Sequence, residues 1–87
     1  MEVEYKPKAL KDREFWKEKG TEKNRKRISA LIDDICAHPS TGIGKPEALR
    51  HQLSGLWSRR IDSEHRIIYE VFPDKISIIS MKGHYSK

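Results

Sequence analysis

The residues best suited to acid–base chemistry are concentrated between Gly44 and Tyr69. This stretch holds one carboxylate after a proline (Glu47), two adjacent arginines, and the pair His65-Arg66. Carboxylates and imidazoles transfer protons, and guanidiniums stabilise negative charge on a reacting phosphate. Spacing alone does not establish that these groups act together, because each of them also has an ordinary structural explanation.

Glu47 follows Pro46 at the start of a short helix that we expect to run from Pro46 to about Leu53. Proline is favoured at the first helical position, and a carboxylate in the first turn complements the helix dipole. This explanation of Glu47 is complete without catalysis, so the local sequence favours a structural role.

We expect Arg60 and Arg66 on two strands joined by a tight turn at 62–64, with their side chains on the same face of a sheet. Two neighbouring guanidiniums repel each other, so an anion is expected near them. In a structural interpretation the anion is an acidic side chain of the same chain: Asp62, Glu64 or Glu70. In a functional interpretation it is a phosphate, and the spacing leaves both open.

Two further groups of residues have the same two interpretations. A basic region from Lys17 to Arg27 includes Lys23 and is either a solvated helix face with pairs such as Glu22–Lys26, or a phosphate-binding surface. The pair His84-Tyr85 lies just beyond the last expected strand, where terminal residues are usually frayed and solvated.

Composition excludes several classes of site and favours one class of partner. The net charge of +5 and the pI of about 9.5 favour a polyanion such as nucleic acid. The segment Gly42–Pro46 lacks the spacing of a nucleotide-binding loop, so we reject nucleotide binding. The four histidines and the single Cys36 lack metal-ligand spacing, so we expect no metal and no cofactor. One cysteine and the lack of a long apolar run indicate a soluble, cytoplasmic protein without a membrane span.

The pattern of elements predicts a single α+β domain over residues 1–87. A helix over 9–19 ends at Gly20, and Thr21 is the expected N-cap of a second helix. That second helix has the clearest apolar stripe in the sequence, made by Ile28, Leu31, Ile32 and Ile35. After the short helix, the period changes to two over 57–61, 65–72 and 76–81, which predicts an antiparallel meander packed against the helical hairpin. Ile78-Ile79 breaks the alternation and indicates burial on both faces or a bulge.

Taken together, the residues from Gly42 to Tyr85 resemble the YoeB-type toxins, a branch of the RelE/ParE superfamily of bacterial toxin–antitoxin systems. The resemblance is carried by a long ungapped pattern, Gly-Lys-Pro-Glu-x-Leu-[basic]-His-x-Leu-Ser-Gly-x-Trp-Ser-Arg-Arg-Ile, then Glu-His-Arg-[apolar]-[apolar]-Tyr and a closing His-Tyr. It implies a RelE-like fold, with an antiparallel sheet packed against an N-terminal helical hairpin. It also implies a metal-independent endoribonuclease that cuts messenger RNA in the ribosomal A site.

The resemblance assigns a role to each matching residue. Glu47 matches the proposed general base, Arg66 the group that stabilises charge on the phosphate, and His84 the general acid. The residues that the resemblance and the basic surface place against RNA are Lys45, Arg50, Arg60, Tyr85, Lys23 and Arg27. The implied partners are mRNA and 16S rRNA on the ribosome, a YefM-like antitoxin with an acidic segment, and a second copy of the chain.

Two departures from the pattern and two rival functions follow from the same comparison. Arg50 stands where the best-known member has lysine, which exchanges a point charge for a planar fork. Ser86-Lys87 extends the chain beyond His-Tyr, and we expect this extension to have a small effect. The rivals are a ParE-like topoisomerase inhibitor that cleaves nothing and a basic RNA-binding module in which the same residues only bind.

Overall fold

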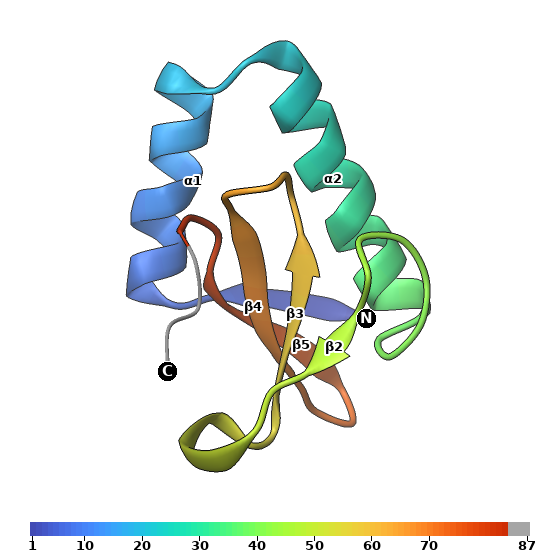
Figure 1. Cartoon of the computed structure of the whole chain (residues 1–87). Helices are drawn as coiled ribbons and strands as arrows, with labels where there is room; N and C mark the ends of the chain where they lie inside the picture. Colours follow the sequence, from blue (N-terminus) through green and yellow to red (C-terminus); the bar gives the residue numbers. More distant parts are fainter. Residues whose placement is uncertain (84–87) are drawn as a thin grey trace.

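The computed structural model describes residues 1–83 and shows a five-stranded sheet with two helices packed on it (Figure 1). In chain order the elements are β1 (Glu2–Tyr5), α1 (Pro7–Lys19), α2 (Glu22–Ala37), β2 (Glu47–Ala48), the 3-10 turn η1 (His51–Leu53), β3 (Leu56–Arg60), β4 (Arg66–Val71) and β5 (Lys75–Ser80). The strand order across the sheet is β1-β5-β4-β3-β2. The predicted α+β class is therefore confirmed.

The two helices begin and end at residues with a clear physical reason. Pro7 occupies the first helical position of α1, where its missing N–H costs nothing. At the other end the Gly20 N–H donates to the Trp16 carbonyl oxygen at 3.0 Å, and a Cβ on Gly20 would lie 2.6 Å from that same oxygen. The Thr21 side chain then accepts from the Asn24 N–H at 3.1 Å, which confirms the predicted N-cap of α2. The chain reverses over these two residues, so α1 and α2 form an inverted V above the sheet (Figure 1).

The sheet is mixed, whereas the meander predicted from the sequence contains only antiparallel strands. Strands β2 to β5 are antiparallel as predicted. β1 pairs in parallel with β5, with Val3 opposite Ile76. The parallel pair arises because β1 and β5 are far apart in the chain, so no hairpin turn dictates their relative direction.

The hydrophobic core lies between the helices and one face of the sheet. The helices contribute the buried residues Ala9, Trp16, Ile28, Leu31 and Ile35. The sheet contributes alternate residues of two central strands, Ile67, Tyr69, Ile76 and Ile78. The predicted stripe of α2 is thus confirmed, with Ile32 partly buried at its edge. Full burial of each aliphatic side chain is worth about 1.5–3 kcal/mol, so this layer supplies most of the driving force.

The register between β4 and β5 confirms the bulge at Ile79. Ile68 is opposite Ser80 and Tyr69 is opposite Ile78, so Ile79 has no partner. Ile76 and Ile78 precede the bulge and both lie in the core. The extra residue shifts the alternation after them, so that Ser80 faces the other side with Ile68, and Met81 lies in the core.

The predicted helix from Pro46 to Leu53 is wrong. Glu47 and Ala48 instead pair with Ser58 and Trp57 of β3, and only residues 51–53 form a single 3-10 turn. His51 has a φ of 59°, which a continuous helix does not allow. Pairing along the free edge of β3 therefore exceeds the local helical preference, and Glu47 is a strand residue with no helix dipole to complement.

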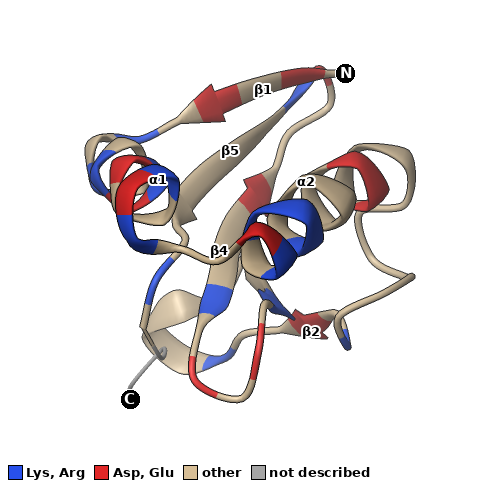
Figure 2. Ribbon diagram, turned by 90° about the horizontal axis from the view of Figure 1, so that it is seen from above, with Lys and Arg blue, Asp and Glu red and all other residues tan. Residues whose placement is uncertain are grey.

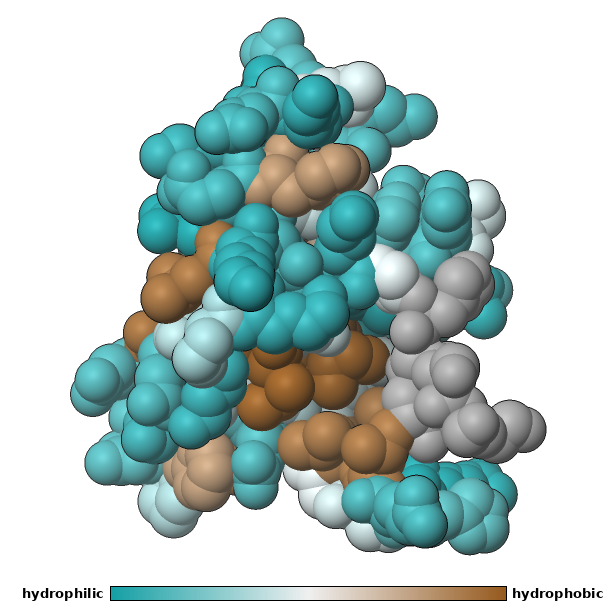
Figure 3. Space-filling view, turned by 90° about the vertical axis from the view of Figure 1, so that its left-hand side faces the viewer, coloured by the Kyte–Doolittle hydropathy of each residue, from teal (hydrophilic) through white to brown (hydrophobic). Residues whose placement is uncertain are grey.

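Charged residues make up 36% of the chain, and among residues 1–83 only Asp12 and Arg59 of them are buried. Seen from above, the basic first turns of α2 lie close to the basic start of β4, and the acidic part of β2 lies on the same side (Figure 2). Viewed from the side of α1, apolar residues reach the surface only in separate patches between hydrophilic ones (Figure 3). Within residues 1–83, neither helix has the length and apolar composition needed to span a membrane.

Candidate functional site

The face of the sheet that the helices leave uncovered carries three of the predicted site residues. Glu47 of β2 is opposite Ser58 of β3, and Arg60 of β3 is opposite Arg66 of β4. Directly opposed residues point to the same face, as do residues two apart on one strand. Glu47, Arg60 and Arg66 therefore project from one face. The strand spacing and rise place the Cα atoms of Glu47 and Arg66 about 12 Å apart, a gap that their long side chains can enter from both sides.

The two arginines of this face are opposite each other across β3 and β4, as predicted. Arg60 is exposed and Arg66 is half-buried, and neither forms an ion pair with a carboxylate within residues 1–83. The Arg66 guanidinium donates to two backbone oxygens, those of Asp62 at 2.9 Å and His65 at 3.2 Å. Asp62, one of the acids of the structural interpretation, forms no ion pair with Arg66 in the described part of the chain, but the charge of Arg66 contributes to the lowered pKa of the Asp62 carboxyl group.

Asp62, one of the acids considered for that role, is committed to its own turn. Burial raises the pKa of its carboxyl group, but hydrogen bonds from the backbone N–H groups of Glu64 and His65 outweigh this effect, so the pKa is lowered. Those bonds measure 2.8 and 2.7 Å and close the turn between β3 and β4. The turn thus holds Arg66 at the start of its strand.

A residue that the sequence analysis did not single out, Arg59, organises the approach to Glu47. Its side chain is fully buried on the helix side of the sheet, where it donates to the Tyr69 hydroxyl at 3.1 Å and to Asp34 Oδ2 at 2.6 Å. It also donates to three backbone oxygens of the loop between α2 and β2, those of His38, Thr41 and Ile43. The alternation along β3 contained the signal, because Arg59 lies between Trp57 and Ile61 on the face predicted to be apolar.

The loop held by Arg59 contains two glycines that lie too close to their neighbours for any side chain. A Cβ on Gly42 would lie 1.9 Å from Asp34 Oδ2, and one on Gly44 would lie 2.6 Å from Leu31 Cδ2. Both glycines also have positive φ values, 120° and 81°. The Gly44 carbonyl oxygen accepts from the Arg60 N–H at 2.7 Å, so the loop is fastened to β3 just before Glu47.

The remaining predicted RNA contacts lie around this face at different distances from it. Lys45 is exposed and has a φ of 53°, an unusual conformation for a non-glycine residue, directly between Gly44 and Pro46. Arg50 is exposed and caps η1, and the described residues show no contact that brings its side chain to Glu47.

Lys23 and Arg27 lie one turn apart on the same side of α2. The Arg27 guanidinium donates to the Arg60 carbonyl oxygen at 3.3 Å, which joins the basic part of α2 to the end of β3. Arg27 therefore connects α2 to the strand that carries Arg60. The Glu22–Lys26 pair of the structural interpretation is also present, at 3.4 Å.

His84 and Tyr85 lie outside the described residues. The chain leads to them from Gly83, whose carbonyl oxygen accepts from the Arg66 N–H at 3.1 Å. The Gly83 N–H donates to His65 Nδ1 at 2.9 Å. His84 therefore directly follows Gly83, a residue that is hydrogen-bonded to the first residue of β4 and to His65 just before it.

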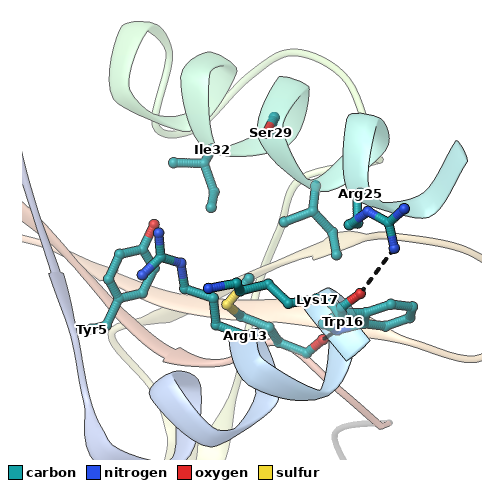
Figure 4. A pocket seen from close by; sticks show the side chains of 9 residues that line it. Tyr5, Arg13, Trp16, Lys17, Arg25, Ser29 and Ile32 are labelled. Carbon is teal, nitrogen blue, oxygen red and sulfur yellow. Dashed lines mark hydrogen bonds between the residues drawn. The ribbon is translucent and has the colours of Figure 1, made fainter. Parts of the chain in front are cut away.

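A pocket of about 200 Å³ lies elsewhere, between the two helices, and is shown in Figure 4. Its polar lining comes from Arg13, Lys17 and Arg25, but Arg25 is occupied by the carbonyl oxygens of Trp16 and Gly20. The pocket is on the opposite side of the sheet from Glu47, so it is separate from the candidate site.

Comparison with known proteins identifies the family. The model of the YoeB-like toxin of bacterial type II toxin–antitoxin systems matches residues 5–85. This chain belongs to that family. Toxin RelK of Mycobacterium tuberculosis is 43% identical to it over 83 residues, which is 95% of this chain and 96% of RelK. Toxin YoeB of Escherichia coli K12 is 47% identical over 72 residues, 82% of this chain and 83% of that protein.

Solved structures agree with this assignment and with the RelE-like fold. A YoeB/ParE toxin from Agrobacterium tumefaciens superposes with a TM-score of 0.92 at 33% identity, covering 98% of this chain and 100% of that one. The YoeB dimer from Staphylococcus aureus superposes with a TM-score of 0.88 at 37% identity, with 98% of each chain covered. A heterotetrameric YoeB–YefM toxin–antitoxin complex from the same organism gives 0.87 at 37% identity and 98% coverage of each chain. The YoeB-like toxin described here is thus a type II toxin by family, as its sequence resemblance implies.

Proposed function

We propose that this toxin is a ribosome-dependent endoribonuclease that cleaves messenger RNA in the A site without a metal ion, and thereby inhibits translation. The observation that supports this proposal most directly is the uncovered face of the sheet. Glu47, Arg60 and Arg66 project from it together, and the two arginines have no carboxylate partner in residues 1–83. Two guanidiniums without an ion-pair partner, on the same face as a carboxylate, suit a phosphodiester between them.

The reaction divides into three roles that these residues fill. Glu47 accepts the proton of the ribose 2′-hydroxyl, whose oxygen then attacks the adjacent phosphorus. Arg66 and Arg60 stabilise the additional negative charge on the pentavalent phosphate. The bond from phosphorus to the 5′-oxygen breaks, and His84 gives that oxygen its proton. The products are a 2′,3′-cyclic phosphate and a free 5′-hydroxyl.

The correction to the fold near Glu47 strengthens this assignment. In the predicted helix, the carboxylate has a structural function at the helix dipole, and in the observed strand it has none. Glu47 is exposed on the edge strand, and within residues 1–83 no lysine or arginine forms an ion pair with it. A carboxylate without a structural partner is free to act on a substrate.

We include the ribosome in the proposal because the uncovered face of the sheet is too small and open to align an mRNA by itself. A chain of 87 residues provides only part of the surface needed to align a flexible mRNA, and alignment accounts for about 7–11 kcal/mol of a barrier. The basic side of α2, with Lys23 and Arg27, provides phosphate contacts to 16S rRNA, while Lys45, Arg50 and Tyr85 contact the mRNA. The toxin therefore acts on an mRNA that the ribosome already holds in place.

The test is cleavage on programmed ribosomes, with the 5′ ends of the fragments mapped. We expect a cut within the A-site codon, and about 10²- to 10⁴-fold slower cleavage for Glu47→Gln and for His84→Gln, with ribosome binding retained. Arg66→Gln should lower the rate by about 10²- to 10³-fold. Retained cleavage in both the Glu47 and His84 variants would overturn the site assignment.

The same experiment separates the two rival functions. A pure RNA-binding module binds the ribosome and produces no fragments with the wild-type sequence. A ParE-like inhibitor produces no fragments and instead blocks DNA supercoiling by a topoisomerase. The proposed acid–base trio speaks for the nuclease, because a protein that only binds has no need of both a proton acceptor and a proton donor.

The uncovered face and the solved structures of relatives also indicate which proteins could bind this toxin. The S. aureus YoeB crystallised both as a dimer and as a heterotetramer with YefM. We infer that this toxin has a YefM-like antitoxin whose acidic segment covers Arg60 and Arg66, and that it forms a homodimer. Co-expression with such an antitoxin should protect ribosome-bound mRNA, and Arg60→Glu should weaken binding of the antitoxin, measured by co-purification of the two proteins.

A further inference from the structure

The chain leaves β5 through a short segment, Met81–Gly83, that is held on both sides. From α1, Asp12 Oδ2 accepts the Met81 N–H at 2.9 Å, and Trp16 Nε1 donates to the Met81 carbonyl oxygen at 2.7 Å. Both side chains are at least nine-tenths buried as residues, so these bonds are protected from water. α1 therefore fixes the first residue of the segment at both of its backbone groups.

The last described residue of the segment is held from the other side by β4 and the residue before it. The Gly83 carbonyl oxygen accepts from the Arg66 N–H at 3.1 Å, and the Gly83 N–H donates to His65 Nδ1 at 2.9 Å. Gly83 has a φ of 85°, so the direction of the chain at this point depends on these two bonds and not on a side chain of its own. His65 supplies the only side-chain atom among the two partners.

The imidazole of His65 can make this bond in only one protonation state. Because Nδ1 accepts a hydrogen bond, the neutral ring carries its proton on Nε2, which lies 3.7 Å from Glu64 Oε1. The ring edge packs on the indole of Trp16 with centroids 5.1 Å apart at 90°, and only 16% of the side chain is exposed. Protonation of Nδ1 would turn the acceptor into a donor that faces the Gly83 N–H.

We propose that His65 is a positioning residue for catalysis: its neutral ring fixes Gly83, the residue that directly precedes His84 in the chain. The inference rests on the proposed function, because it assigns a use to the direction of the chain at Gly83. His65 itself touches no reacting atom. Protonation of Nδ1 removes the acceptor for the Gly83 N–H, so cleavage should fall on acidification.

Charges of both signs surround the ring. On its own turn, Glu64 Oε1 lies 3.7 Å from Nε2, and the Asp62 carboxylate accepts the His65 backbone N–H. The Arg66 guanidinium donates to the His65 carbonyl oxygen. α1 presents the uncharged Trp16 ring, and its nearest charged pair, Asp12 with Lys8, is bonded to the Met81 N–H.

The first test follows the bond itself and needs no activity. In the ¹⁵N-labelled full chain, the Gly83 amide should be protected from hydrogen exchange at pH 8 and should lose protection, with a change in chemical shift, as His65 is protonated. Asparagine places Oδ1 where the imidazole has Nδ1, so His65→Asn should keep the protection at every pH between about 5 and 8. His65→Leu should lack it throughout. If the hydrogen exchange and the chemical shift of the Gly83 amide do not change when His65 is protonated, the inference is wrong.

The second test uses the same two variants on programmed ribosomes. Both lose the ring contact with Trp16, so they are matched in packing and differ in the acceptor. We expect His65→Leu to lower kcat by about 10- to 100-fold without weakening ribosome binding, since a misplacement of about 1 Å costs up to 10²-fold. His65→Asn should cleave at least ten times faster than His65→Leu and lack the acidic decline of the wild type.

The outcomes distinguish the inference from the proposed function. Equal loss in both variants with an unchanged pH profile means that His65 has a packing role only, and it overturns the inference. The wild-type chain could instead protect the Gly83 amide as expected but produce no mRNA fragments. That result would contradict the proposed nuclease, and the bond between His65 and Gly83 would then have a structural role only.

Discussion

Two adjacent arginines on β3 have opposite environments. Arg59 points to the helix side, where its guanidinium is fully buried and donates five hydrogen bonds. Arg60 points to the uncovered side and is exposed, with no carboxylate partner within residues 1–83. The same type of side chain thus has a structural role on one face of the sheet and is a candidate phosphate ligand on the other. The alternation of a single strand assigns the two roles.

The buried side also explains how the uncovered side is shaped. Arg59 binds Asp34 of α2 and three carbonyl oxygens of the loop that follows, and this loop ends at Gly44, which is bonded to Arg60. Glu47 follows Gly44 three positions later in the chain. The position of the proposed base therefore depends on a network that it does not touch, on the far side of the sheet.

The largest expected effect is a separation of stability from activity between the two arginines. Arg59→Met should lower the free energy of unfolding by about 3–5 kcal/mol, because it removes a buried guanidinium and leaves the Asp34 carboxylate and several carbonyl oxygens without their donor. Arg60→Met should change it by no more than about 0.5 kcal/mol, yet slow mRNA cleavage by at least tenfold. Urea denaturation and ribosome cleavage measure the two effects.

Equal stability of the two arginine variants would contradict the role of Arg59 as the structural centre of the loop. Undiminished cleavage by Arg60→Met would remove Arg60 from the site and leave Arg66 as its only described arginine. Arg59→Lys is a useful third variant, because it keeps the charge but cannot make five bonds with one ammonium group.

The second effect concerns the loop that Arg59 holds. Gly44→Ala forces a side chain into a φ of 81° and against Leu31, so we expect a loss of about 1–3 kcal/mol and slower cleavage through displacement of Glu47. Gly55→Ala is the matched control: its φ is 96°, but a Cβ there meets nothing within 4 Å. It should cost only the backbone strain and leave cleavage unchanged.

If both glycine variants lose the same stability and the same activity, the contact between Gly44 and Leu31 has no role beyond backbone conformation. Thermal unfolding followed by circular dichroism, together with the cleavage assay, is sufficient to decide.

The features that could be predicted from the sequence are those that depend on hydrophobic periodicity and on helix capping. The stripe of α2, the Thr21 cap and the pairing of Arg60 with Arg66 across a tight turn are all local signals, and all three are confirmed. Glu47 was assigned to the site only through family resemblance, and its local structure was predicted wrongly. A proline followed by a carboxylate favours a helix start, and only the free edge of β3 makes it a strand.

Arg59 shows why the rest could not be predicted. A guanidinium is rarely buried, so charge alone places it on the surface. Its five acceptors come from α2, the following loop and β4, which are brought together only by the complete fold. The bond between His65 and Gly83 is of the same kind, since it joins residues 18 positions apart. The direction of β1 likewise depends on its pairing with β5, which no hairpin signals.

A third effect appears only in acid. The hydrogen bond from Arg59 lowers the pKa of the Asp34 carboxyl below its ordinary value of 3.8, and the Ile43 N–H adds to this effect. A carboxyl group whose pKa is lower in the folded state stabilises the fold above its unfolded pKa, and that contribution disappears as the pH falls through the folded value. We expect the free energy of unfolding to decrease below about pH 4, and Asp34→Asn to be less stable at pH 7 but flatter in acid.

Denaturation curves between pH 2 and 7 measure this effect. The Asp62 carboxyl also has a lowered pKa, so Asp62→Asn provides the matched comparison on the uncovered side. Identical acid profiles for wild type and Asp34→Asn would mean that Arg59 gains nothing from the charge of its partner.

The smallest effect tests whether the uncovered face extends onto α2. Lys23→Glu should weaken ribosome binding modestly and reduce the dependence of binding on salt, because one phosphate contact contributes about 0.7–0.9 to the slope of log K against log salt concentration. Lys11→Glu changes the net charge equally from an exposed position on α1, so it separates a specific contact from general attraction. If the two reversals lower the slope equally, only net charge draws the toxin to the ribosome. A larger reduction for Lys23→Glu, repeated by Arg27→Glu, indicates that the basic side of α2 and the arginines of the sheet form one phosphate-binding surface, joined where Arg27 meets Arg60.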